Sequence, residues 1–263
     1  MSTAVERFAA LVRGPEDGIG LDTACLLIAA HTRGDADHEP ALSSGVEELD
    51  RLAARCAGAD LEVVRHQLFG VEGFAGNRRH YDDHRNSYLD DVLARRCGIP
   101  ITLAVVVIEV GRRVGLPLAG VGMPGHFLVG AGGGHYIDAF DGGRVLDSAG
   151  CRRRYVELAG PVAPWSTAML APVGPLAIVA RVLANLRGVF AATDDLGALA
   201  RVLELRTAIP GVPAAERAER SAVLSALGRY GEAATELDRL AALDGGDADE
   251  IRLRAAALRA RLN

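Results

Sequence analysis

The sequence contains no lysine: all 29 residues counted as Lys or Arg are arginine. Chemistry that depends on lysine, such as a Schiff base, an amine nucleophile or a P-loop, is therefore excluded. Basic charge is scarce overall: the net charge is −5, and the one basic triplet, Arg152 to Arg154, is typical of a solvated turn. We therefore expect no nucleic-acid partner.

Cysteines are also few, and no two of them form a CxxC pair: Cys25, Cys56, Cys97 and Cys151. Such wide spacing argues against a zinc ribbon or a disulfide framework and predicts reduced, mostly buried thiols. No apolar run reaches the roughly 18 to 20 residues that cross a bilayer, and no secretion signal is visible at the N-terminus. We expect a cytoplasmic protein without a membrane partner.

The 263 residues, 49% of them hydrophobic and 24% charged, suffice for one large domain or two modest ones. We expect one domain over 1–175, with a helical part (1–68) and a core (69–175), followed by a helical region over 176–263. In the first part, the spacing of apolar residues predicts helices over 4–12, 21–31, 46–56 and 61–68. The Gly-, Asp-, His- and Pro-containing stretch over 32–43 is typical of a loop.

The middle part begins with signals for two successive helices. Ser87 can cap the first helix, Asp90 and Asp91 lie in its first turn, and Gly98 is a candidate stop. Pro100 suits the first position of the second helix, where its missing N–H costs nothing. The β-branched run over 101–110 fits a buried strand, whereas its length through residue 114 fits a buried helix, so periodicity alone leaves both open.

After Gly115 the pattern changes to short strand-like runs that glycines separate, over 118–121, 126–129 and 135–140. The last part, 176–263, is helical again and rich in Ala, Leu, Arg and Glu. Its segment 226–234 has the small-residue and tyrosine pattern of tetratricopeptide helices, and a helix pair over 183–190 and 196–209 precedes it. Two copies are fewer than an independent solenoid needs, so we expect a helical cap on the middle part.

Five motifs together carry a family resemblance. They lie in this order within residues 86–143, about a fifth of the chain: Asn86-Ser87-Tyr88-Leu89, Gly98-Ile99-Pro100-Ile101-Thr102-Leu103, Arg112-Arg113-Val114-Gly115-Leu116-Pro117, Pro124-Gly125-His126-Phe127-Leu128-Val129 and Ile137-Asp138-Ala139-Phe140-Asp141-Gly142-Gly143. On these motifs the chain resembles the SirB1 family, whose members carry a transglutaminase-like domain followed by tetratricopeptide-like helices. The resemblance implies an α+β, papain-like core with a central buried helix and a small antiparallel sheet, and favours the helix for the ambiguous run.

The resemblance also implies a site. Active relatives of this fold place a cysteine nucleophile at the start of the central helix, where the dipole lowers the thiol pKa, and a His and an Asp follow on neighbouring strands. The last two positions carry over to His126 and Asp138. Counting about fifteen residues back from Gly115 gives Pro100 for the first position, and proline cannot attack a carbonyl.

For His126 and Asp138 to meet, we expect them to be directly opposed on a hairpin. This register pairs Gly130 with Gly134 and leaves a three-residue loop over 131–133. A slip of one residue would send the two side chains to opposite faces.

Two other residues are candidate nucleophiles. Cys97 lies three residues before Pro100, although a buried structural thiol is the plainer interpretation. Thr102 lies two residues into the helix, where its hydroxyl could equally cap backbone groups or pack. His126 and Asp138 have their own structural interpretation, a buried pair that holds a hairpin together.

Three functions follow from this reading. The first is a non-catalytic module that binds a protein or peptide through the cleft or the C-terminal helices. The second is an amide hydrolase or acyl transferase, in which Cys97 or Thr102 attacks, His126 is the base and Asp138 orients it. The third is a metal site at His80, Asp82, Asp83 and His84, although a polar loop explains the same residues. No cofactor is implied.

Overall fold

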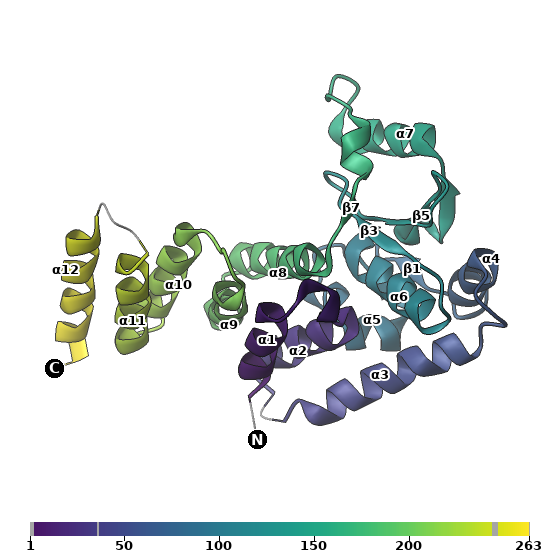
Figure 1. Ribbon diagram of the computed structural model, residues 1–263. Coiled ribbons are helices and arrows are strands. Elements are labelled where there is room, and N and C mark those ends of the chain that lie inside the picture. Colours follow the sequence, from purple (N-terminus) through teal and green to yellow (C-terminus); the bar gives the residue numbers. More distant parts are fainter. Residues whose placement is uncertain (1–2, 36, 244–246, 263) are drawn as a thin grey trace.

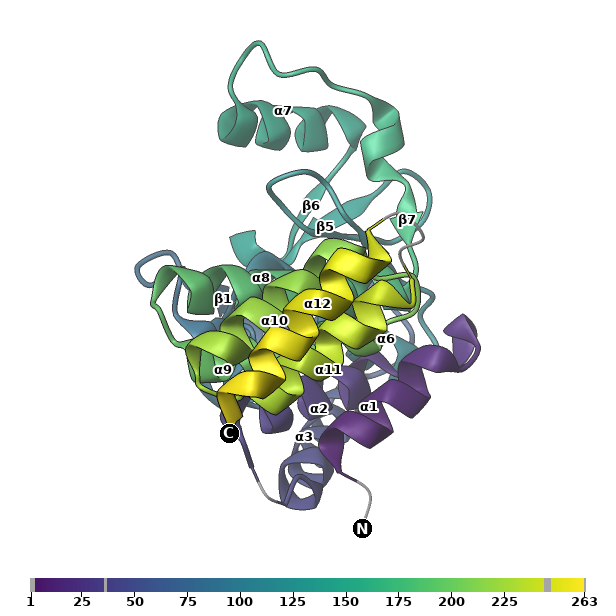
Figure 2. The same cartoon turned by 90° about the vertical axis from the view of Figure 1, so that its left-hand side faces the viewer.

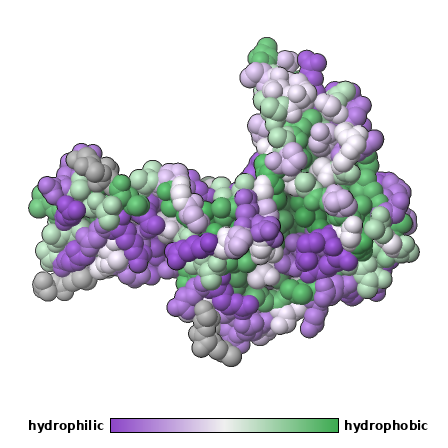
Figure 3. Space-filling view, viewed as in Figure 1, coloured by the Kyte–Doolittle hydropathy of each residue, from purple (hydrophilic) through white to green (hydrophobic). Residues whose placement is uncertain are grey.

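The computed structural model describes residues 3–35, 37–243 and 247–262. Figure 1 shows three regions: a body of helices around α6, a lobe that carries a small sheet and α7, and an arm of helices that leads to the C-terminus. In the space-filling view of Figure 3 the lobe and the arm project from the body in the same way. The chain is therefore an α+β protein with a central helix, a small antiparallel sheet and a helical C-terminal region, as predicted.

The N-terminal part is helical. It contains α1 (Ala4–Arg13), a short 3₁₀ turn (Glu16–Gly18), α2 (Leu21–Arg33), α3 (Glu39–Ala54), α4 (Leu61–Arg65) and a π-helical turn (His66–Val71). The predicted loop over 32–43 is wrong in large part, because α3 begins at Glu39 rather than at Val46. Pro40 lies in the first turn of α3, where its fixed φ favours a helix start.

The middle part contains the central helix. Its elements up to that helix are β1 (Ala75–Gly76), a 3₁₀ turn (His84–Asn86), α5 (Leu89–Arg95), β2 (Cys97–Gly98) and α6 (Pro100–Arg113). The ambiguous run is helical: α6 begins at Pro100, and all of its residues through Gly111 are buried. Helices and strands pack on α6 from all sides, among them α3, α5 and β4, and a helix buried in this way needs no polar stripe, which is why periodicity could not identify it.

Both ends of α5 differ from the prediction. Asp90 and Asp91 lie in its first turn as expected, but its N-cap is Tyr88 and no side chain caps it, so Ser87 is not the cap. Gly98 is not the stop either, because Arg96 already adopts a left-handed conformation with φ of 55°.

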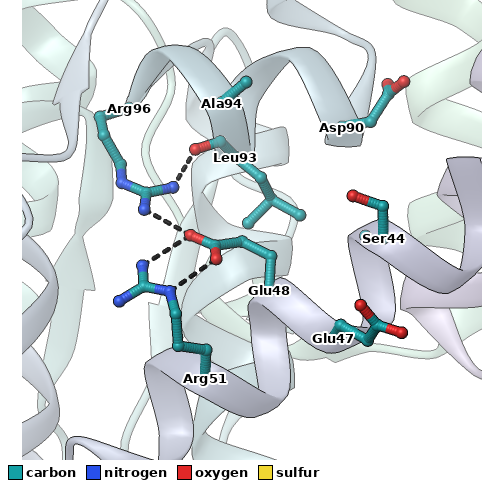
Figure 4. Close-up of a pocket in the computed structure, with 9 residues that line it drawn as sticks. Ser44, Glu47, Glu48, Arg51, Asp90, Leu93, Ala94 and Arg96 are labelled. Atoms are coloured by element: carbon teal, nitrogen blue, oxygen red, sulfur yellow. Dashed lines mark hydrogen bonds and ion pairs between the residues drawn. The ribbon is translucent and has the colours of Figure 1, made fainter.

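Ion pairs hold Arg96 in that conformation. Its guanidinium binds Glu48 of α3 and the Leu93 carbonyl, and Glu48 also accepts two hydrogen bonds of 2.6 Å from Arg51 (Figure 4). Glu72 accepts a further hydrogen bond of 3.0 Å from Arg96. This network fixes the start of β2 against α3.

The sheet has the strand order β6-β5-β4-β3-β7, and all of its neighbouring strands are antiparallel. The elements are β3 (Ala119–Val121), β4 (Leu128–Gly130), β5 (Tyr136–Asp138), a 3₁₀ turn (Ala139–Asp141), β6 (Arg144–Leu146), α7 (Ser148–Ala159), a 3₁₀ turn (Thr167–Leu170) and β7 (Pro172–Val173). Both faces are covered, since Val129 and Ile137 join the main core whereas Leu128 and Leu146 join a small core with Cys151 and Tyr155 of α7.

The described residues of the C-terminal part contain α8 (Pro175–Ala192), α9 (Leu196–Ala208), α10 (Ala214–Ala226), α11 (Tyr230–Ala241) and α12 (Ala248–Arg259), with a last 3₁₀ turn (Ala260–Leu262). Each helix packs on the next, and Figure 2 shows α12 stacked in front of α10 and α11. Only α8 and α9 pack closely on α1 and α2, so the predicted cap covers the N-terminal helices more than the middle part, and the later helices form the arm.

The predicted division at residue 175 stays a prediction. One hydrophobic core runs across it and includes Val179 and Leu183 of α8 together with Ala104 and Val107 of α6. By length and composition α8 could cross a membrane. The prediction that no apolar run is long enough to do so did not anticipate this helix. A single helix of this kind is weak evidence, because core helices pass the same test, and Val182 and Leu186 of α8 are buried in this core.

Candidate functional site

The structure brings His126 and Asp138 together. Asp138 ends β5, and His126 lies two residues before β4. The Nε2 atom of His126 lies 2.9 Å from Oδ1 of Asp138. Both side chains are buried, with 5% of His126 and none of Asp138 exposed.

The predicted hairpin register is wrong by two residues. Gly130 pairs with Tyr136 rather than with Gly134, and the loop consists of three glycines at 132–134, all with positive φ. Asp138 therefore opposes Leu128, and His126 lies diagonally across from it. Because side chains alternate with a period of two, a slip of two residues keeps both groups on one face, and diagonal neighbours still reach each other.

Asp138 has a second cationic partner, which the sequence analysis missed. The Nε atom of Arg154 donates to Oδ2 of Asp138 at 3.0 Å, and its Nη2 donates to Asp141 at 2.6 Å. The backbone N–H of Asp141 also donates to Oδ1 of Asp138. Burial opposes ionisation of Asp138, but the hydrogen bond from His126, the charges of His126 and Arg154 and the Asp141 amide together hold its pKa below the usual value.

The expectation of a solvated turn over 152–154 is therefore wrong. These residues lie in α7, where Arg152 and Arg153 are exposed and Arg154 turns inward. The spacing of four between Cys151 and Tyr155, both buried, was the available signal for a helix with one face on the sheet.

Aromatic and basic residues cover the other side of His126. The ring of Phe140 lies edge-on to His126 at 6.2 Å and edge-on to Tyr81 at 5.9 Å. Arg78 lies over the Phe140 ring at 4.9 Å and donates to Asp141 at 2.7 Å. The loop after β1 is thereby tied to the hairpin.

Helix α8 reaches the same hairpin. Arg181 donates to the backbone carbonyls of His126, at 2.9 Å, and of Met123, at 3.2 Å. The C-terminal region thus contacts the backbone at the position of the histidine.

The first turn of α6 offers no free nucleophile. Pro100 is the first helical residue, and Ile101 follows it. The Thr102 hydroxyl is fully buried and donates to the Asn86 carbonyl at 2.6 Å, while it accepts from the Ile99 N–H at 3.3 Å. Thr102 therefore stabilises the start of α6, in agreement with the interpretation that its hydroxyl caps backbone groups.

Cys97 differs from the other cysteines. It lies in β2, paired with Ala75, and is the one cysteine that is not fully buried. Burial raises the pKa of Cys25, Cys56 and Cys151, the last to about 11. All four are free thiols.

The cluster over 80–84 does not form the metal site considered above. Within the described residues, no group of three or more His, Cys, Asp and Glu side chains converges as a metal site requires. The hydrogen bond from Arg85 is the main cause that lowers the pKa of Asp83 to about 2, and the ring of His84 packs against Tyr88 and Phe190.

A cavity of ≈ 460 Å³ lies at the start of α6, between the loop after β1 and α8. The Ser87 hydroxyl lines it and makes no side-chain hydrogen bond with any residue that the structure describes, although Ser87 is only 2% exposed. Asn86 holds this loop in place, because its amide donates to the carbonyls of His80 and Tyr81. The lining residues are Tyr81, Asp82, Asp83, Ser87, Ile99, Ala184, Asn185, Gly188, Val189, Ala192 and Thr193.

Comparison with known proteins identifies similar sequences. The sequence profile of the transglutaminase-like superfamily matches residues 37–184, which include α3 to α6, the whole sheet and the first half of α8. A UPF0162 protein of Xylella fastidiosa (strain Temecula1) is 40% identical over 205 residues, which are 75% of this chain and 71% of that protein. UPF0162 protein PA3419 of Pseudomonas aeruginosa is 32% identical over 234 residues, 83% of this chain and 84% of its own.

The similarity extends to a eukaryotic protein over the middle of the chain. Human F-box only protein 21 is 31% identical over 143 residues, which are 50% of this chain and 23% of that protein. No solved structure gives a significant match.

Proposed function

The chain belongs to the transglutaminase-like superfamily, together with the UPF0162 proteins. From this premise we propose that it is a cytoplasmic module of the SirB1 type that binds peptides. We further propose that it has lost the nucleophile of the superfamily. The observation that carries the proposal is the start of α6. Proline occupies the first helical position, and the hydroxyl of Thr102, two residues further into the helix, is buried and hydrogen-bonded to backbone. The standard acyl-transfer chemistry has no atom there with which to begin.

The surroundings of Asp138 support the same conclusion. In a catalytic triad the carboxylate stabilises the imidazolium that forms when the histidine accepts a proton. Here Arg154 shares that carboxylate, so a permanent cation already compensates part of its negative charge. These contacts join the segment before β4, the end of β5 and α7, which is a structural role.

The cavity at the start of α6 supplies the binding site of this proposal. Small residues of α8, namely Ala184, Gly188 and Ala192, form one wall and allow a peptide backbone to approach closely. Ser87 and Asn185 add a hydroxyl and an amide, which can pair with peptide N–H and C=O groups. An apolar wall with a few polar groups is the usual composition of a ligand pocket.

The test is a peptide-display selection on the full chain, followed by binding measurements with two variants. Ala184→Arg should fill the cavity and abolish binding of the selected peptides. Ala177→Arg, seven residues earlier on the same exposed face of α8 but outside the cavity, should leave binding unchanged. Selection of no peptide, or equal binding by both variants, would contradict the proposal.

The second candidate function is an amide hydrolase or acyl transferase with a displaced nucleophile. The exposure of Cys97, three residues before Pro100, is the observation that favours it. Rapid labelling of Cys97 by a thiol-directed probe at neutral pH, together with an amidase activity that Cys97→Ala abolishes, would establish this alternative. Labelling no faster than that of a free cysteine would exclude it.

A further inference from the structure

A second pocket, of ≈ 330 Å³, lies between the N-terminal helix α1 and the helices α9 to α11. Four arginines line it, against two glutamates: Arg13, Arg217, Arg220, Arg239, Glu6 and Glu204. Figure 1 shows α1 beside α9, where the arm leaves the body, and the lobe that carries β5 lies away from this point.

Three of these arginines share a single buried carboxylate. Glu236 of α11 is 2% exposed and accepts from Arg217 at 3.1 Å, from Arg220 at 2.8 Å and from Arg239 at 2.6 Å. Arg220 also donates to Glu204 at 3.0 Å, and His31 shares that glutamate at 3.1 Å. One carboxylate cannot balance three guanidinium groups.

The pocket is therefore left with excess positive charge. Four arginines stand against Glu6, Glu204 and Glu236, which gives a formal excess of one positive charge. Arg13 forms no ion pair or hydrogen bond with any residue in the described ranges. The buried Nε atoms of Arg217 and Arg220 also lack a hydrogen-bond partner there. Buried donors that remain unpaired are costly, and a missing ligand is one explanation for them.

We propose that this pocket binds a small oxyanion, either free phosphate or the carboxylate of a small acid. The planar, five-donor fork of arginine matches both groups, and an anion would neutralise the excess charge. The pocket volume of ≈ 330 Å³ is large enough for a small anion, because it far exceeds the roughly 30 Å³ that one water molecule occupies in the liquid. This site lies apart from the cavity at the start of α6, so it stands whether or not that cavity binds peptide.

The test is thermal unfolding of the full chain in sodium phosphate, sodium acetate and sodium chloride at equal ionic strength. We expect a saturable rise of the unfolding temperature in phosphate or acetate that chloride does not produce, since a ligand that binds only the folded state stabilises it. A response to phosphate alone identifies a phosphate site, and a response to acetate as well identifies a carboxylate site.

Two variants assign the effect to the pocket. Arg13→Gln removes a cation that has no partner among the described residues, so it should leave the unfolding temperature in chloride unchanged and weaken phosphate binding about tenfold. Arg252→Gln, on the exposed face of α12, is the matched control and should bind phosphate normally. Equal effects of phosphate, acetate and chloride, or full binding by Arg13→Gln, would overturn the proposal.

Discussion

Replacing Arg154 with alanine should destabilise the protein by about 3 kcal/mol at pH 7. The substitution removes a hydrogen bond of 3.0 Å to Asp138 and one of 2.6 Å to Asp141. Hydrogen bonds to charged groups are worth about 1.5–3 kcal/mol each, and the fully buried Asp138 would lose its permanent cation. The contact with Glu157 adds little, because that side chain is 64% exposed.

The loss should depend on pH with a definite sign. The pKa of Asp138 is lowered in the folded protein, so the carboxylate contributes stability that is fully present above its unfolded pKa of about 3.9. That contribution disappears as the pH falls through the folded pKa. The difference between wild type and Arg154→Ala should therefore be constant above about pH 5 and shrink in acid.

Urea unfolding followed by circular dichroism, repeated between pH 3 and pH 8, measures both effects. Arg153→Ala is the matched control: Arg153 is the neighbouring residue of α7, it is exposed, and it forms no ion pair within the described ranges. Its substitution should change stability by less than about 0.5 kcal/mol. If Arg154→Ala costs no more than Arg153→Ala, or if its cost does not fall in acid, Arg154 does not hold the Asp138 carboxylate as argued.

Four further predictions concern the surroundings of the site and the cysteines. Thr102→Val should cost about 1–3 kcal/mol in urea unfolding, because it leaves the Asn86 carbonyl and the Ile99 N–H unpaired in the core. Thr235→Val, at an exposed position of α11, should cost under about 0.5 kcal/mol, and equal costs would contradict the capping role. Gly76→Ala should cost about 1–3 kcal/mol in the same assay, since its Cβ would lie 2.5 Å from the Phe140 ring and 2.6 Å from the Phe140 carbonyl oxygen. By contrast, Gly188→Ala, on an open face of α8, should stabilise by about 0.5–1 kcal/mol, and a loss there would show that the face is not free. Finally, a thiol reagent at pH 7 should modify at most one cysteine per folded chain, Cys97, and all four after unfolding; mass spectrometry that finds Cys25 or Cys151 modified in the folded protein would refute their burial.

Most of the helices could be predicted from the sequence because each pairs an apolar stripe with local end signals. The proline at the start of α6 and the glycine after its end fixed that helix at both ends, once the family motifs had decided between helix and strand. The prediction failed where long-range contacts decide the local structure. Arg96 ends α5 in a left-handed conformation because Glu48 and Glu72, far away in the sequence, bind its guanidinium, and no local pattern could reveal this.

The hairpin shows which part of a site the sequence determines. Side chains alternate between the two faces of a strand, and this alternation alone predicts that His126 and Asp138 lie on the same face. The exact pairing depended on the turn, where three consecutive glycines with positive φ moved the loop by one residue and the register by two. The sequence could thus predict that the two side chains meet, although not which backbone groups pair around them.

Arg154 lay beyond this reasoning because its role depends on how α7 packs on the sheet, which a single sequence does not state. Yet Arg154 and Pro100 both bear on whether the site is catalytic. On the proposed alignment, Pro100 stands where the attacking atom would be, and Arg154 pairs with the carboxylate that would support a basic histidine. These two observations support the proposed loss of catalysis, and they are compatible with a fold in which His126, Asp138 and Arg154 join the hairpin to α7.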